Sequence, residues 1–92
     1  MKDIINLIPR GQANAVTRRE LCELTGWNDR KVREAIFQAR RDHLILNLQD
    51  GNGYFQPTED ESHLVKRFYE QEMKRLKSIG WALKPAREWL YG

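Results

Sequence analysis

Apolar residues recur at helical spacing in two neighbouring segments between residues 17 and 42. In the first segment Leu21 and Leu24 share one face, and Thr17 with Glu20 makes the capping-box pattern that begins a helix. In the second segment the apolar residues are spaced three and four apart, as on the buried face of a helix: Val32, Ala35, Ile36 and Ala39. The pattern predicts two short helices, the second over about residues 28–42.

Gly26 lies at the joint between these two segments, where the first helix must stop. Glycine adopts the left-handed conformation of a helix C-terminus without steric cost. We expect Trp27 to fill the corner and Asn28 to cap the second helix. Ahead of the pair, another short helix is predicted by the apolar residues Ile4, Ile5, Leu7 and Ile8. In the connector, Ala15 and Val16 are expected to form a short strand.

The segment after the second helix has the pattern of a β-hairpin. Residues 44–49 are mostly apolar and suit extended backbone, and residues 50–53, Asp-Gly-Asn-Gly, are a strong turn signal. Residues 54–56 make the second strand, and Pro57 ends it because proline cannot donate to a ladder. The predicted fold class is therefore mainly α with a small β-hairpin (α+β).

The run from Leu21 to Ile36, followed by residues 39–45, resembles the winged-helix (helix-turn-helix) DNA-binding domain family of bacterial and phage transcriptional regulators. In that family a small residue, here Cys22, lets the two helices approach, and a glycine, here Gly26, makes the turn. The chain differs from the family pattern at Thr25, Ala39 and His43, where an apolar residue, a larger aliphatic and a glycine are usual. The resemblance implies a winged helix-turn-helix domain at residues 1–57, with its second helix in the major groove.

Basic residues gather on the predicted helix pair. Residues 1–43 carry nine Lys or Arg against six Asp or Glu, whereas residues 44–57 contain Asp50 and no cation. The resemblance implies that some of these side chains neutralise phosphates and others meet base edges. The candidate DNA-binding residues are Arg18, Arg19, Asn28, Asp29, Arg30, Lys31, Arg33, Glu34 and Gln38. The alternatives are a solvated charged face and a hairpin that only closes the core.

Residues 58–92 form a predicted C-terminal helical extension. Thr58 with Glu61 repeats the capping box, and a helical pattern follows for some 20–25 residues, with a stripe that approaches a coiled-coil seam. The sequence predicts a kink or end between Gly80 and Lys84, and a last helix over residues 86–91. The aromatic end either folds back on the core or docks on a partner. The candidate dimer or partner interface comprises Val65, Tyr69, Leu76, Ile79, Trp81, Leu83 and Trp89.

Composition narrows the class of protein. The chain has 92 residues, 40% of them apolar, and a net charge of +3, which suits one small core. Its single cysteine, Cys22, excludes an internal disulfide and is expected to be a small packed residue rather than a reactive thiol. We find no targeting or membrane-spanning pattern and expect a cytoplasmic protein. His43 and His63 lack partners at metal-ligand spacing, and no catalytic motif is present, so we expect no enzyme activity, metal or cofactor.

The sequence therefore favours a DNA-binding transcriptional regulator of bacterial or phage type that binds double-stranded DNA as a homodimer. The alternative is a winged helix that acts as a protein-interaction module, in a replication or phage assembly complex with little DNA contact. Salt-dependent binding to duplex DNA distinguishes these two classes, because phosphate contacts release counterions.

Overall fold

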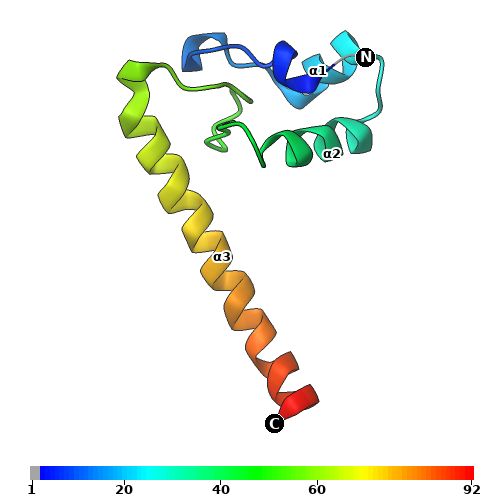
Figure 1. Cartoon of the computed structure of the whole chain (residues 1–92), viewed down its shortest axis with the longest axis vertical. Coiled ribbons are helices and arrows are strands. Elements are labelled where there is room, and N and C mark those ends of the chain that lie inside the picture. The colour runs from blue at the N-terminus through cyan, green and yellow to red at the C-terminus, as the bar shows by residue number, and fades with distance from the viewer. Residues whose placement is uncertain (1–2) are drawn as a thin grey trace.

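The computed structural model describes residues 3–92, and most of them are helical. The α-helices of this part are α1 (Arg18–Thr25), α2 (Asp29–Ala39) and α3 (Ser62–Tyr91). Short 3-10 helices precede them: η1 (Ile4–Leu7) and η2 (Gln12–Asn14) come before α1, and η3 (Glu59–Glu61) leads into α3. Helices α1 and α2 lie together at one end of the molecule, and α3 leaves that end as a single rod (Figure 1).

The β-hairpin predicted for residues 44–57 is wrong, because residues 3–92 contain no sheet. Helix makes up 66% of the structure and strand-type backbone only 7%. The paired residues within the described range form isolated bridges: Arg10 with Gln56, Val16 with Tyr54, and Leu46 with Phe55. The strand predicted at Val16 is likewise a single bridge. The fold is therefore mainly α and has no wing.

The backbone between the bridged residues Leu46 and Phe55 explains why pairing stops. Gln49, Gly51 and Gly53 have positive φ angles of 60°, 84° and 101°. The side chains of Asn47 and Asp50 each accept a hydrogen bond from the backbone N–H two residues later, at 3.0 and 3.1 Å. Such Asx turns curl the chain locally and compete with a ladder. Two strands therefore cannot run alongside each other beyond one bridge.

The 45–55 segment still holds the molecule together, because its side chains alternate between two hydrophobic clusters. Ile45 and Tyr54 belong to the first cluster, with residues of η1, α1 and α2. Their neighbours Leu46 and Phe55 belong to the second cluster, with Leu64 of α3. Successive side chains of extended backbone point to opposite sides. The segment thus connects the helix pair to the first turns of α3.

The predicted caps of α1 are confirmed. The Thr17 hydroxyl accepts the N–H of Glu20 at 3.1 Å, and the Glu20 carboxylate accepts the N–H of Thr17 at 3.1 Å. At the other end Gly26 is left-handed, with φ of 74°, and its N–H donates to the carbonyl of Cys22 at 2.9 Å. Cys22 itself packs against the first cluster. Helix α1 therefore begins and ends where local chemistry predicts.

The buried face of α1 differs in one position from the prediction. Leu21 is fully buried, but Leu24 is 53% exposed, and Thr25 takes its place in the core. The Thr25 hydroxyl donates to the carbonyl of Leu21 at 2.7 Å and accepts the N–H of Trp27 at 3.1 Å. A buried hydroxyl with both partners carries no unsatisfied polar group. These two hydrogen bonds therefore allow Thr25 to occupy a core position.

Helix α2 has the predicted buried face but is shorter than expected. Val32 and Ile36 are buried, and Ala35 and Ala39 pack beside them. The helix ends at Ala39 rather than at about residue 42, and turns follow at residues 40–42. His43 does not have a positive φ, since Gln49 is the one non-glycine residue in the described part with that geometry. Three-ten turns at this end replace the glycine stop.

Helix α3 runs without a break from Ser62 to Tyr91, so the predicted kink between Gly80 and Lys84 and the separate last helix are wrong. Pro85 has no backbone N–H to donate to the carbonyl of Trp81, four residues earlier. Every residue from 74 to 91 is exposed, so water reaches that carbonyl. The aromatic end does not fold back on the core (Figure 1). Within residues 3–92, no helix has the length and apolar character needed to cross a membrane.

Candidate nucleic-acid interface

The turn between α1 and α2 fixes the N-terminus of α2 at the surface. Trp27 packs against the first cluster, and the Asn28 side-chain oxygen accepts the Lys31 N–H at 2.8 Å, which caps α2. This confirms the predicted cap and commits the Asn28 oxygen to it. The NH₂ group of the Asn28 side chain is left to donate a hydrogen bond to a base or a phosphate.

The predicted base-contacting residues of α2 lie on the side opposite its core. Arg30, Arg33 and Glu34 are exposed, while Val32 and Ile36 face the first cluster. Arg33 follows Asp29 by four residues, and Glu34 follows Arg30 by four. The members of each pair are therefore neighbours along the helix surface. Gln38 follows Glu34 by four residues, and both line a groove that also contains Phe37. The structure therefore places Arg30, Arg33, Glu34 and Gln38 on one exposed side of α2, with Asp29 beside Arg33.

Carboxylates accompany the arginines of this face. Asp29 forms an ion pair with Arg18 of α1 and another with Arg33, whose Nε lies 3.3 Å from Asp29 Oδ2. The hydrogen bond from Arg18 to Asp29 raises the pKa of the Arg18 guanidinium, and a smaller contribution comes from Tyr54. Asp29 thus joins the start of α1 to the start of α2.

Two further pairs lie within single helices. Arg30 Nε is 3.3 Å from Glu34 Oε1, and Arg19 Nε is 3.7 Å from Glu23 Oε1, both at spacing i,i+4. All four side chains are well exposed. Exposed pairs of this kind contribute about 0–1 kcal/mol each, so a phosphate or a guanine edge can replace the carboxylate at little cost.

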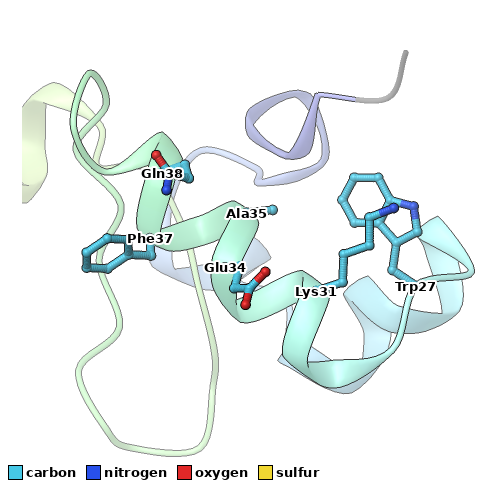
Figure 2. A pocket seen from close by; sticks show the side chains of 6 residues that line it. All are labelled: Trp27, Lys31, Glu34, Ala35, Phe37 and Gln38. Carbon is cyan, nitrogen blue, oxygen red and sulfur yellow. The ribbon is translucent and has the colours of Figure 1, made fainter.

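A shallow groove of about 510 Å³ runs along the flank of α2. It is lined by Trp27, Lys31, Glu34, Ala35, Phe37 and Gln38, and Figure 2 shows Phe37 at one end and Trp27 with Lys31 at the other. The Lys31 ammonium lies 4.5 Å from the centroid of the Trp27 ring. This cation–π contact holds Lys31 beside the turn.

Phe37 is a candidate that sequence reasoning missed. Its side chain is 65% exposed, and it follows Glu34 by three residues and Arg33 by four. These spacings put Phe37 on the same face as the predicted contact residues, one turn further along α2. The sequence carried this signal, because Phe37 is out of step with the apolar stripe Val32, Ile36 and Ala39.

Arg40 serves the fold rather than this surface. Its guanidinium carbon lies 5.8 Å from the Tyr54 ring centroid and 5.4 Å from that of Phe68, and its Nε donates to the Ile45 carbonyl at 3.2 Å. Burial among these groups lowers the pKa of the Arg40 guanidinium. Arg40 therefore ties the end of α2 to the first turns of α3.

The predicted interface residues on α3 do not all share one face. Tyr69, Leu76, Ile79 and Leu83 are spaced so that they form one exposed stripe, whereas Val65 packs on the second cluster of its own chain. Trp81 is two residues from both Ile79 and Leu83, which places it about 200° round the helix from each. Trp89 also lies off the stripe. The two tryptophans are 75% and 88% exposed.

Comparison with known protein families, curated proteins and solved structures finds no match to this chain.

Proposed function

We propose that this protein is a sequence-specific DNA-binding regulator of bacterial or phage type, which acts in the cytoplasm and inserts α2 into the major groove of double-stranded DNA. The observation that carries the proposal is the arrangement of α1 and α2. A capped helix, a left-handed glycine turn and a second capped helix present an exposed face with Arg30 and Arg33 in its first turns. Helix-turn-helix proteins read base edges with these first turns.

The residues divide between positioning and reading. Arg19, at the exposed N-terminal turn of α1, is assigned to a phosphate, and Lys31 to a phosphate beside the turn. Arg30 and Arg33 are assigned to base edges, because arginine pairs with guanine through two hydrogen bonds that contribute about 1–3 kcal/mol of discrimination. Arg18 positions Asp29, which can accept a hydrogen bond from the N4 amino group of cytosine. In the absence of DNA, the Glu34 carboxylate pairs with Arg30 and the Glu23 carboxylate pairs with Arg19. DNA then takes the place of these carboxylates.

No wing takes part in this mechanism. The 47–53 loop contains Asp50 and no lysine or arginine, so phosphate neutralisation falls to α1 and α2 alone. A single small helix pair makes few phosphate contacts, and affinity for one site is then modest. Two copies of the helix pair on one duplex raise the affinity, because the second contact forms within an already bound complex.

The exposed stripe of α3 supports such a homodimer. Residues 69, 76, 83 and 90 are spaced by seven, as are residues 72, 79 and 86, which is the heptad pattern of a coiled coil. Because α3 continues through Pro85, the stripe extends to Ala86 and Leu90 and is longer than the sequence pattern alone indicated. Glu72 interrupts it, with its carboxylate held 3.3 Å from Arg75 Nη1. The exposed part of α3, residues 74–91, is about 27 Å long at 1.5 Å per residue.

A second candidate function rests on Trp81 and Trp89. Both lie off the stripe, so a two-stranded coiled coil leaves them in water, although tryptophan commonly dominates protein interfaces. This observation favours a protein-interaction module of a replication or assembly complex, in which α3 docks on a different protein. In that case α2 binds duplex DNA weakly and without sequence preference.

Two single variants test the assignment of roles. Arg33→Ala should relax sequence preference at one position, whereas Arg19→Ala should weaken binding to all duplexes and lower the salt slope by about one. Binding curves on a selected duplex and on a scrambled one, each at several salt concentrations, measure both effects. Equal loss of affinity on every sequence for both variants would contradict the assignment.

A further inference from the structure

Phe37 is an apolar side chain around which three arginines outnumber the one carboxylate, that of Glu34. Arg33 precedes it by four residues, Arg30 by seven, and Arg41 follows it by four, so all three lie near it along one side of α2 and its continuing turn. The ring is 65% exposed and does not join either hydrophobic cluster. In Figure 2 it points away from Trp27 and Lys31 at the opposite end of the groove. A ligand for this patch must offer both negative charge and a small apolar group.

Duplex DNA has both features in its major groove. The phosphates are anionic, and among the four bases only thymine presents a methyl group there, at C5. A phenylalanine on a recognition helix can contact that methyl, which is one of the apolar readouts available to proteins. The guanidinium groups around Phe37 disfavour an apolar protein surface, because their desolvation would have to be compensated.

We propose that Phe37 is a specificity-determining residue that contacts the C5 methyl group of a thymine. This inference rests on the proposed function. Four residues of helix separate Phe37 from Arg33, a rise of about 6 Å. With base pairs about 3.4 Å apart, a helix lying along the groove places the thymine about two base pairs from the base that Arg33 contacts.

The test uses replacement of thymine by deoxyuridine, which removes the methyl group and nothing else. The duplex selected by the wild-type chain is resynthesised with one thymine at a time replaced, and the dissociation constant is measured for wild type and for Phe37→Ala. Leu44→Ala is the matched control, since Leu44 is another exposed apolar residue, 46% accessible, outside α2. Because Phe37 is exposed, Phe37→Ala should keep the helical circular dichroism of the wild type.

We expect one deoxyuridine position to weaken wild-type binding about threefold to fourfold, the value for losing one buried methyl group. Phe37→Ala should lose sensitivity at that position and keep the wild-type response at the others, and Leu44→Ala should behave as wild type throughout. A selected sequence without thymine opposite α2, or methyl sensitivity that Phe37→Ala retains everywhere, would overturn the inference and leave the proposed function standing. Absence of any duplex binding at low salt would overturn both.

Discussion

Asp29 can contact a cytosine only at a matching site, and on DNA of random sequence its negative charge opposes binding, so its replacement by asparagine gives a sharp prediction. Its carboxylate pairs with Arg18 of α1 and Arg33 of α2 and lies in the first turn of α2. Asp29→Asn removes one negative charge from the proposed interface and releases both guanidinium groups. The Asn28 cap stays in place, because it uses the backbone N–H of Lys31.

The magnitude follows from exposure and charge. Both pairs are about half exposed, so each contributes at most about 1 kcal/mol to stability, and the favourable helix-dipole position of Asp29 adds about 0.3–1 kcal/mol. The free energy of unfolding should fall by no more than about 3 kcal/mol. Because Arg33 is assigned to a base edge, Arg18 is the arginine that can gain a phosphate. One such contact steepens the salt dependence of log affinity by about 0.9, so the gain in affinity is about eightfold larger at 0.1 M salt than at 1 M.

Fluorescence anisotropy on a labelled random-sequence duplex, from 50 to 300 mM salt, measures both the affinity and the slope. The control is Asp60→Asn, which makes the same change of charge in η3, outside the helix pair. We expect tighter binding and a steeper slope for Asp29→Asn, with little change for Asp60→Asn. If Asp29→Asn binds no better than Asp60→Asn, then Arg18 and Arg33 do not face DNA and the placement of α2 is wrong.

Other predictions address stability and assembly. Gly53→Ala should destabilise the fold by about 1–3 kcal/mol more than Gly51→Ala. Both glycines have positive φ, but only a Cβ at Gly53 overlaps the Val16 carbonyl and lies 2.8 Å from Thr17 N, which breaks the bridge between Val16 and Tyr54. Urea unfolding followed by circular dichroism measures the difference, and equal losses of stability would argue against that close approach. Hydrogen bonds from the N–H groups of Gln12 and Thr58 lower the pKa of Glu61, so this carboxylate stabilises the fold above the ordinary glutamate pKa of 4.5 and the effect is lost as pH falls through the lowered pKa. Glu61→Gln should therefore reduce the fall of Tm on the acid side of a plot of Tm against pH. Some acid dependence should remain, because the Asn52 N–H also lowers the pKa of Asp50. An unchanged acid side would refute the role of Glu61. Leu76→Asp with Leu83→Asp should convert a dimer to a monomer by light scattering, whereas Ser78→Asp, off the stripe, should not; a monomeric wild type or a dimeric double variant would contradict pairing through this face.

The helix pair was predictable because its boundaries depend on local chemistry. Thr17, Glu20, Gly26 and Asn28 satisfy or terminate the nearest backbone groups, and the structure shows each of them doing so. The buried residues of α2 followed from spacing alone. Leu24 was misplaced because Thr25, with its hydroxyl bonded to the Leu21 carbonyl, fills the inward position instead.

The hairpin was not predictable from its turn signal. Asp-Gly-Asn-Gly favours a turn, but it does not specify that Gln49 also adopts a positive φ and that the Asn47 and Asp50 side chains curl the chain. The apolar residues that suggested strands are explained by two clusters on opposite sides of one segment. The apolar run thus indicated extended backbone, and the predicted pairing of two strands was wrong.

The continuity of α3 depended on solvent, which sequence pattern does not report. Proline breaks a buried helix when the carbonyl four residues earlier has no partner, but Trp81 and its neighbours are exposed, so water can replace the missing donor. For the candidate site, the spacing of the apolar residues indicated that the charged side chains of α2 lie away from its buried face. The pairing of the arginines with Asp29, Glu34 and Glu23 was not predictable, because it depends on rotamers and on the approach of α1 to α2. Phe37 was missed because aromatic residues are usually assigned to a core.

The most direct test is selection of duplexes from a random-sequence library at moderate salt, with the Arg30→Ala/Arg33→Ala double variant alongside the wild type. An enriched motif that disappears in the double variant, in two symmetric half-sites, is the predicted result. The absence of any enrichment by the wild type, with no affinity at low salt, would contradict DNA recognition by α2 and would direct attention to the protein that Trp81 and Trp89 bind.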